Sequence, residues 1–269
     1  MNNQLTIFSV THKDFIFPEC KFIQPIQVNK EKTGLELRFL SDNIGDNISN
    51  KNENYAELTA LYWIWKNLNN INSEFVGLCH YRRYFTLPTK KNIFEKLTAW
   101  LHSNKKEIVL IKPAEQSYLN ELGAQQVATQ TINILKNNKV IVPTASSLKI
   151  SKTINFSIKH HYIYFHVADD WNILEQVIKE KFPEYTQSLS FFDTHQHMHC
   201  YNMFISDKKF IENYCSWLFT ILFEVEKRIY ISKYPYQQRV LGFMAERLLN
   251  LYLYKNNIEK AEMPILYFE

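Results

Sequence analysis

The short apolar run Phe75–Cys79 ends abruptly at four polar residues, His80, Tyr81, Arg82 and Arg83. A run of this length with such an end predicts a buried strand that delivers its last side chains to one edge of a sheet. In open α/β sheets, ligands bind outside the carboxyl ends of the strands. Two adjacent guanidinium groups there suit phosphate oxygens, although the same arginines could equally pair with surface carboxylates.

The segments ahead of this run predict a strand and a helix. Residues 5–10 predict a first strand, which is followed by Thr11, His12 and Lys13. Residues 55–67 predict a helix, because large apolar side chains recur at the i, i+3, i+4 and i+7 positions: Leu58, Leu61, Tyr62 and Trp65. The Asn-rich stretch 41–54 predicts a long polar loop, and loops of that length are often functional. The strand–helix–strand order favours an α/β fold that handles nucleotides.

The rest of the chain continues the mixture of helices and strands. Apolar periodicity predicts helices over 93–101, 124–137, 166–181, 209–228 and 237–254, and strands over 108–111, 139–143 and 202–206. Residues 151–165 mix aromatic residues and histidines without a clear period. Because no linker, internal repeat or low-complexity stretch interrupts the pattern, we expect one domain over residues 1–269.

Composition excludes several classes of protein. The chain has five glycines and contains neither a Gly-x-Gly-x-x-Gly motif nor a Gly-Lys-Ser/Thr motif, which argues against dinucleotide-binding Rossmann proteins and P-loop NTPases. A net charge of +4 suits anionic ligands and is too small to indicate nucleic acid. With no apolar stretch of membrane-spanning length, no signal-like start and four cysteines outside any Cys-x-x-Cys pair, we expect a cytoplasmic location.

Three clusters of polar residues could carry chemistry. Asp193, His195, His197 and His199 alternate, so on an extended chain they would share one side and could bind Zn²⁺ or another transition metal. The same four could instead bind a sugar acceptor, supply a base or form a polar loop. Asp169 and Asp170 superficially resemble an Asp-x-Asp metal–phosphate motif. We interpret them instead as a structural pair at the expected start of a helix, where carboxylates favour the helix dipole. Glu246 shares a helix face with Arg239 and Asn250, and is either a general base or an ordinary surface residue.

Taken together, these segments resemble a known family. The similarity runs through residues 11–13, 46–49, 52, 55–67, 76–85, 183–185, 202–205, 217–227 and 238–250, and contributes little from about 90 to 160. These segments are similar to the glycosyltransferase family of capsular and exopolysaccharide biosynthesis proteins, which long carried only a domain-of-unknown-function label. The block of residues 55–85, with its helix and its His-Tyr-Arg-Arg sequence, is long enough to be specific.

The resemblance implies an α/β, GT-A-like fold, with a Rossmann-like mixed central sheet flanked by helices. Residues 1–90 would form the nucleotide-sugar-binding half, and residues 140–269 the acceptor half with the C-terminal helices. GT-A enzymes hold a divalent metal with an Asp-x-Asp motif at the end of a central strand. Here residues 80–83 take that place without a carboxylate pair, so we expect no required metal cofactor, with Mn²⁺ or Mg²⁺ left open. Arg82 and Arg83 would then neutralise the leaving diphosphate.

The same resemblance assigns roles to individual residues. The donor-binding set would be Thr11, His12, Lys13, Asn52, Tyr55, Glu57, His80, Tyr81, Arg82 and Arg83. The acceptor-binding set would be His195, His199, Asn202 and Arg239. A reaction that inverts the anomeric configuration needs a base, for which Asp193 and Glu246 are the two candidates. A reaction that retains the configuration needs none, and both would then be binding residues.

The function expected from the sequence is therefore glycosyl transfer. The donor would be a nucleotide sugar, with a UDP-sugar favoured, and the reaction that of a hexosyltransferase. The acceptor would be a growing capsular, lipopolysaccharide or exopolysaccharide chain, presented as an oligosaccharide or linked to a lipid. The basic excess would suit peripheral contact with the inner membrane surface. Two alternatives remain: a metal-dependent hydrolase that uses His195, His197 and His199, and a non-catalytic carbohydrate-binding module.

Overall fold

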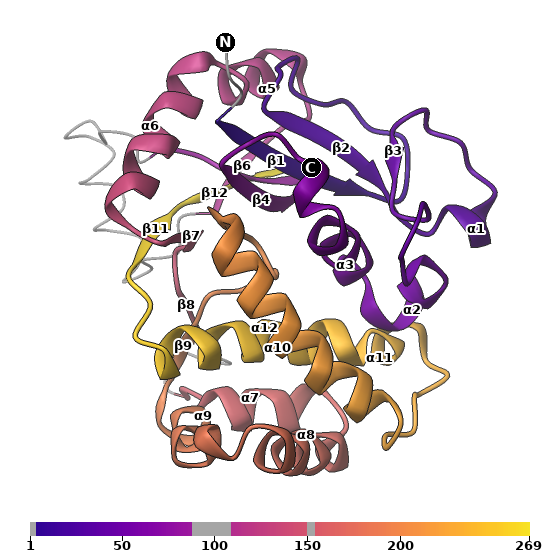
Figure 1. Ribbon diagram of the computed structural model, residues 1–269, viewed down its shortest axis with the longest axis vertical. Coiled ribbons are helices and arrows are strands. Elements are labelled where there is room, and N and C mark those ends of the chain that lie inside the picture. Colours follow the sequence, from indigo (N-terminus) through magenta and orange to yellow (C-terminus); the bar gives the residue numbers. More distant parts are fainter. Residues whose placement is uncertain (1–3, 88–108, 150–153) are drawn as a thin grey trace.

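The computed structural model describes residues 4–87, 109–149 and 154–269 (Figure 1). Over these residues, a ten-stranded mixed sheet has the order β11-β7-β10-β4-β1-β2-β3. Beside this path, β5 pairs with β4, β12 with β5, and β6 with β12. Its strands are β1 Leu5–Thr11, β2 Ile23–Gln27, β3 Leu40–Ser41, β4 Phe75–His80, β5 Arg83–Phe85, β6 Val109–Lys112, β7 Val140–Pro143, β10 Phe204–Asp207, β11 Lys260–Met263 and β12 Ile265–Phe268. Strands β8 Ser146–Ser147 and β9 His197–Met198 form a separate pair.

Helices cover both faces of the sheet. They are α1 Lys30–Thr33, α2 Asn52–Tyr55, α3 Leu58–Lys66, α5 Gln116–Leu122, α6 Gln125–Asn137, α7 Ile158–Phe165, α8 Ala168–Lys181, α9 Ser190–Thr194, α10 Lys208–Glu226, α11 Pro235–Gln238 and α12 Val240–Lys255. Helices α5 and α6 lie on one face, and α3, α10 and α12 on the other, with α7, α8 and α9 as a further layer (Figure 1). None of these helices is long and apolar enough to cross a bilayer.

The central strands are buried on both faces, which explains their nearly continuous apolar sequences. Every residue of β1 is buried. Its side chains alternate between two apolar clusters: Phe8 and Val10 join the cluster formed with α3, α10 and α12, while Leu5 and Ile7 join the one formed with α5 and α6. Alternate side chains of a strand point to opposite faces, so one run of residues feeds both clusters.

The pairing of strands brings several chain segments to one edge of the sheet. Strands β1 and β4 are parallel, and Val10 lies opposite His80, so both strands end at the same edge. Strand β10 is antiparallel to β4, with Phe204 opposite Leu78. The start of β10 therefore lies near the end of β4, and the residues before it reach the same edge.

Most of the expected elements are confirmed. The strands predicted over 5–10, 75–79, 139–143 and 202–206 correspond to β1, β4, β7 and β10, and the helices over 124–137, 166–181 and 209–228 to α6, α8 and α10. The strand over 108–111 corresponds to β6 in its described part, and α12, preceded by the short α11, accounts for 237–254. Asp169 and Asp170 stand in the first turn of α8, the position that the sequence predicted for them. The helix predicted over 93–101 lies outside the described residues.

Two expectations about helices were wrong. The helix predicted over 55–67 is broken at Ala56, which has a φ of 49° and separates α2 from α3. The Asn52 side chain supports the break, donating to the Ala56 carbonyl at 2.8 Å and to Thr59 Oγ1 at 3.0 Å. Residues 151–165 contain a helix, α7, where no period was recognised. Its overlooked signal is Ser157, whose hydroxyl caps the helix by accepting from the His160 backbone N–H at 3.2 Å.

Gly77 in the middle of β4 leaves no room for a side chain. A Cβ atom there would lie 2.8 Å from Ile205 Cγ1 and 2.9 Å from the Phe204 carbonyl oxygen. We expect Gly77→Ala to lower the free energy of unfolding by about 1–3 kcal/mol, because the added methyl group forces β10 away from β4. Urea denaturation followed by circular dichroism measures this change.

Gly242 in α12 provides the matched control. A Cβ atom at this position would lie 3.6 Å from the Ala56 Cβ, which is an ordinary contact distance. Alanine also favours a helix over glycine by about 1 kcal/mol, so Gly242→Ala should not destabilise the protein. Equal unfolding midpoints for the two variants would contradict the close packing of β4 against β10.

Candidate active site

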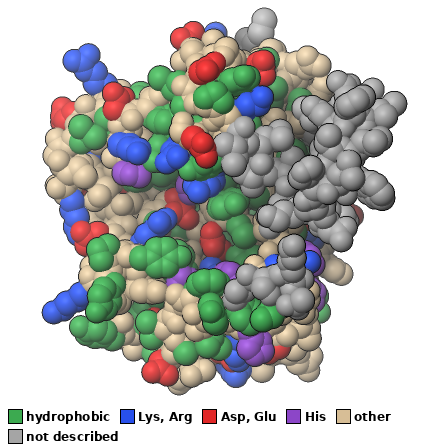
Figure 2. All heavy atoms as spheres, turned by 180° about the vertical axis from the view of Figure 1, so that it is seen from behind, with side chains coloured by type: hydrophobic (Ala, Val, Ile, Leu, Met, Phe, Trp, Pro, Cys, Tyr) green, Lys and Arg blue, Asp and Glu red, His purple; other side chains and the backbone are tan. Residues whose placement is uncertain are grey.

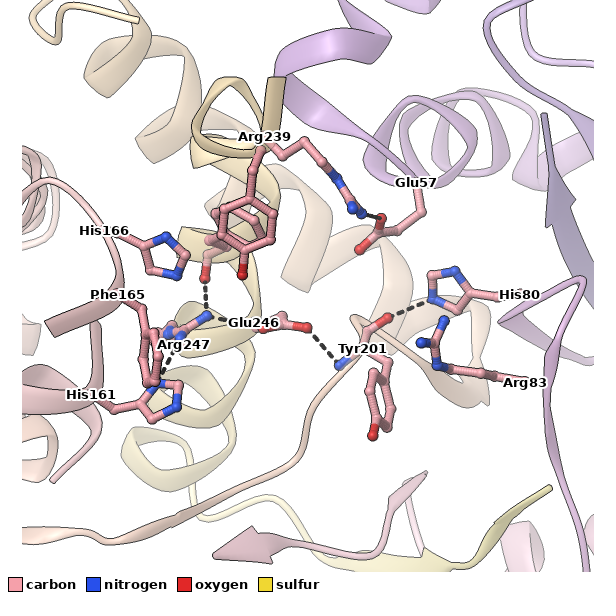
Figure 3. A pocket seen from close by; sticks show the side chains of 12 residues that line it. Glu57, His80, Arg83, His161, Phe165, His166, Tyr201, Arg239, Glu246 and Arg247 are labelled. Carbon is pink, nitrogen blue, oxygen red and sulfur yellow. Dashed lines mark hydrogen bonds and ion pairs between the residues drawn. The ribbon is translucent and has the colours of Figure 1, made fainter. Parts of the chain in front are cut away.

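A pocket of about 440 Å³ opens where the sheet edge meets α7, α11 and α12. Twelve residues line it: Glu57, His80, Arg83, His161, Phe165, His166, Tyr201, Tyr236, Arg239, Phe243, Glu246 and Arg247. The face opposite to the view of Figure 1 is hollowed, and acidic, basic and histidine side chains gather in the hollow (Figure 2). Figure 3 shows the pocket side chains, which come from segments far apart in the sequence.

His80 and Arg83 form the end of the pocket nearest the sheet. His80 Nε2 lies 2.7 Å from the Tyr201 carbonyl oxygen, and because that oxygen only accepts, Nε2 carries the proton of the neutral ring. Burial lowers the pKa of His80 below its ordinary value, against the opposing effect of the Glu57 carboxylate. Neutral His80 therefore leaves Nδ1 as an acceptor at this end of the pocket.

The two adjacent arginines have different surroundings. The Arg83 guanidinium lies against two rings, 4.9 Å from the centroid of Tyr201 and 5.0 Å from that of Tyr267. Arg82 also contacts Tyr267, but its Nε donates to the Phe268 carbonyl at 2.8 Å, and it does not line the pocket. Within the described parts of the chain, neither arginine has a carboxylate at ion-pair distance. Among the described residues, Arg83 is thus a cation that lines the pocket, lies against two aromatic rings and has no carboxylate partner.

Glu57 is held in the pocket by the chain break that precedes it. It follows Ala56, is 9% exposed, and accepts a hydrogen bond from Asn202 Nδ2 at 2.7 Å. Arg239 NH2 lies 3.7 Å from its other oxygen, with half of the arginine side chain exposed. In a regular helix over 55–67, the Glu57 side chain would point in a different direction. The break at Ala56 is therefore part of how the site is built.

Glu246 lies between the two ends of the pocket. Its Oε1 accepts from the Tyr201 backbone N–H at 2.8 Å, and its Oε2 accepts from Arg247 NH1 at 2.9 Å (Figure 3). Burial raises the pKa of Glu246 above its ordinary value, with Arg247 opposing the shift and Glu57 adding to it. The Arg247 side chain is only 3% exposed, and its NH2 lies 3.1 Å from His161 Nδ1. A carboxylate with a raised pKa in a pocket is suited to exchange a proton with a ligand.

The turn before β10 forms one side of the pocket and is hydrogen-bonded to α12. Tyr201 and Asn202 have φ values of 76° and 52°, so the chain makes a left-handed turn there. Asn202 Nδ2 also donates to the Gly242 carbonyl at 3.0 Å, and Asn250 Oδ1 accepts from the His199 backbone N–H at 2.8 Å. The turn is therefore fixed to α12 at several points.

The end of the pocket away from the sheet is aromatic. The His166 ring stacks on Phe243 with centroids 4.2 Å apart, and His161 packs against Phe165 at 4.8 Å. Burial, followed by the nearby Arg247 charge, lowers the pKa of both histidines to about 4. Both imidazoles are consequently neutral at pH 7.

Five of the residues expected in the site line this pocket, and the others lie elsewhere. The five are Glu57, His80, Arg83, Arg239 and Glu246. Around them, His12 and Lys13 are exposed beside the Tyr81 ring at the end of β1, and Thr11 is buried with its hydroxyl bonded to the Lys13 carbonyl. Asn52 supports the break at Ala56, and buried Tyr55 donates to Glu226 at 3.1 Å. Neither of these side chains lines the pocket.

The predicted alignment of residues 193–199 was wrong. Asp193 is exposed on α9, His195 follows that helix, and His197 is exposed in β9, so the four residues share no extended face. His199 is buried, with Nδ1 2.7 Å from the Pro143 carbonyl oxygen. Within the described residues, no group of three or more histidine, cysteine or acidic side chains could hold a metal ion. The hydrolase alternative thus lacks the histidine cluster on which it depended.

Seven pocket residues were not expected in a donor or acceptor site: His161, Phe165, His166, Tyr201, Tyr236, Phe243 and Arg247. The sequence did place Phe243 on the same helix face as Glu246, by their i, i+3 spacing, but gave it no role in binding. The residues of α7 and α11 carry no local signal, because only tertiary packing brings them to the sheet edge.

Comparison with known proteins identifies the family. The family described as a domain of unknown function, DUF4422, matches residues 6–257. The chain belongs to this family. Among solved structures, the apo structure of the bifunctional glycosyltransferase WbbM matches with a TM-score of 0.83 and 27% sequence identity. The match covers 99% of this chain and 46% of that one, so the chain spans less than half of WbbM. No curated protein sequence matches it.

These matches confirm the fold expected from the sequence. The DUF4422 chain has a mixed α/β architecture with a central sheet flanked by helices, and it shares that architecture with part of a glycosyltransferase. The resemblance to a family of glycosyltransferase-like proteins with a domain-of-unknown-function label is likewise confirmed.

The ion pair between buried Arg247 and partly buried Glu246 gives a test of the site's construction. We expect Arg247→Leu to lower the free energy of unfolding by about 3 kcal/mol, because it leaves the Glu246 carboxylate without its cation. Arg228→Leu removes an arginine from a surface pair with Glu180 and Glu224 and should change stability little. Chemical denaturation of both variants measures the difference, and comparable losses would argue against a special role for the Arg247–Glu246 pair.

Proposed function

We propose that this protein is a glycosyltransferase that uses a nucleotide-sugar donor. The observation that carries the proposal is Arg83, a cation that lines the pocket and has no carboxylate partner among the described residues. It stands just past the end of a central strand of the sheet, where ligands of α/β folds bind. The likeness to part of a bifunctional glycosyltransferase supports the same reaction.

Arg83 would stabilise the departing group. In glycosyl transfer, the bond between the anomeric carbon and the diphosphate oxygen breaks, and the diphosphate leaves with the electron pair. Negative charge therefore grows on the phosphate oxygens, and a cation already fixed in place stabilises it without reorganising. The Tyr201 and Tyr267 rings fix the Arg83 guanidinium, and a guanidinium can bind two phosphate oxygens at once.

The pocket does not fit a divalent metal. Its two carboxylates are both engaged, Glu57 by Asn202 and Arg239, and Glu246 by the Tyr201 N–H and Arg247. Proteins commonly hold Mg²⁺ with one or two carboxylates together with substrate phosphates, but both carboxylates here already face an arginine and an N–H donor. We therefore derive no step through a metal.

Glu246 is the base that we favour for a reaction with inversion. The acceptor hydroxyl oxygen attacks the anomeric carbon and loses its proton, which Glu246 would take. Asp193, the other candidate from the sequence, is exposed on α9 and does not line the pocket. In a reaction with retention, Glu246 would instead bind the acceptor hydroxyl.

The donor and acceptor follow from these assignments as finer proposals. We favour a UDP-sugar that carries a hexose as donor, and a growing capsular, lipopolysaccharide or exopolysaccharide chain as acceptor. Synthesis of such chains on a lipid carrier would bring the protein to the cytoplasmic face of a membrane, and its net charge of +4 suits an anionic surface.

Nucleotide binding tests the role of Arg83. We expect one of UDP, GDP, CMP and dTDP to raise the melting temperature of the wild-type protein in the presence of EDTA. Arg83→Gln should weaken this binding roughly 10- to 100-fold, since it removes charged hydrogen bonds to phosphate. Thermal-shift titrations measure both effects.

Arg228→Gln is the matched control, because it removes the same charge from the surface pair with Glu180 and Glu224. Equal weakening in both variants would contradict a specific site at Arg83. Nucleotide binding without sugar transfer from any donor would favour a non-catalytic binding module.

The pH profile tests the role of Glu246. The base must be ionised, so kcat should fall as pH drops through its pKa, at a midpoint above the ordinary glutamate value because burial raises that pKa. Glu246→Gln should lower kcat roughly 10²- to 10⁴-fold and remove this acidic limb. Asp193→Asn should leave the profile unchanged, and the reverse pattern would identify Asp193 as the base.

A further inference from the structure

The two ends of the pocket differ in chemistry. Near the sheet, Arg83 provides positive charge beside His80, and Arg239 faces Glu57. The other end consists of rings from α7, α11 and α12, namely Phe165, Tyr236 and Phe243 with His161 and His166. Glu246 stands between them and is bonded to Tyr201 on one side and Arg247 on the other (Figure 3). We refer to the five ring residues as the aromatic end.

Two rings of the aromatic end are open to a ligand and held in place. Phe165 is 42% exposed and Tyr236 is 59% exposed, although both line the pocket. Gln237 fixes the segments that carry them: its Nε2 donates to the Phe165 carbonyl at 2.9 Å, and its Oε1 lies 3.2 Å from His166 Nδ1. Tyr236 lies nearly parallel to His166, at 17° with centroids 6.0 Å apart. Large apolar surfaces fixed in this way bind a flat face of a ligand at little entropic cost.

The aromatic end carries little net charge. His161 and His166 are neutral at pH 7, since the pKa of each is lowered to about 4. The charge of Arg247 is offset by Glu246 at 2.9 Å, and Arg239 lies beside Glu57 at 3.7 Å. Neutral imidazoles both donate and accept hydrogen bonds, as sugar hydroxyls do. An anionic group placed here would approach the like charge of Glu246. Arg247 is only 3% exposed and already paired, and Arg239, which lies 5.8 Å from the centroid of the Phe243 ring, faces Glu57.

From this geometry we infer that the aromatic end is the acceptor subsite and that it prefers an uncharged sugar residue to a uronic acid. A sugar ring would stack on Tyr236 and Phe165 and present a hydroxyl to Glu246, while the donor diphosphate lies at Arg83. The inference rests on the proposed glycosyl transfer and adds the class of acceptor. It also assigns a binding role to residues of α7 and α11 that the sequence did not indicate.

Saturation-transfer NMR with simple glycosides tests the subsite. The probes are the methyl glycosides of glucose, galactose and N-acetylglucosamine, with methyl glucuronide and methyl galacturonide as acidic counterparts of the first two. We expect ring-proton signals from at least one neutral glycoside and weaker signals from its acidic counterpart. Tyr236→Ala should weaken the neutral glycoside's binding roughly 2- to 10-fold, as expected for loss of one stacked ring, whereas Tyr236→Phe should preserve it.

The thermal shift produced by the nucleotide that binds the wild type, measured on the same variants, separates this inference from the proposed function. Tyr236→Ala should leave this nucleotide shift intact, and its loss would mean that the aromatic end holds the nucleobase, which overturns the inference. Absence of glycoside signals in the wild type, equal signals from acidic probes, or signals unaffected by Tyr236→Ala would overturn it as well. Glycoside binding without any nucleotide binding would support a sugar subsite at the aromatic end and contradict the proposed glycosyltransferase function.

Discussion

The parallel pairing of β1 with β4 is the constraint on which the rest of the structure depends. Its register sets Val10 opposite His80, so both strands stop at one edge, and antiparallel β10 then has to start there. The turn at Tyr201 is thereby brought next to His80. Helix α12 is placed beside the same turn, because its Glu246 accepts a hydrogen bond from the Tyr201 backbone N–H. A site assembled from segments more than a hundred residues apart thus follows from the alignment of two short apolar strands.

The sequence predicted those parts of the fold that have a local period. Strands β1 and β4 and helices α6 and α10 each bury a regular set of side chains, and such sets are visible in one segment alone. The break at Ala56 was missed because the apolar stripe that indicated a helix lies entirely within α3, beyond the break. The C-terminal strands β11 and β12 were missed too, since their partners lie far away along the chain.

The candidate site was predictable to a similar extent and for similar reasons. Residues at the end of an apolar run, such as His80 and Arg83, can be recognised from that run, and both line the pocket. The alternation of Asp193 with the three histidines led to a wrong prediction at residues 193–199. That prediction assumed an extended chain, whereas Asp193 belongs to a helix. Tyr236 and His161 carry no local signal, since their place in the pocket arises from contacts of α7 and α11 with α12. Charge and periodicity therefore located the positively charged end of the pocket, whereas they gave no indication of the aromatic end.

The turn at Tyr201 and Asn202 has a consequence for how ligands are selected. It is bonded to His80 on the sheet, to Glu246 on α12 and to Glu57 beside α3, so any displacement would break several hydrogen bonds together. A turn that is hydrogen-bonded to three different elements is held in one conformation and does not act as a hinge. Ligands that reach it are discriminated by how well they match a surface already in shape, and little of their binding free energy is spent on deforming it.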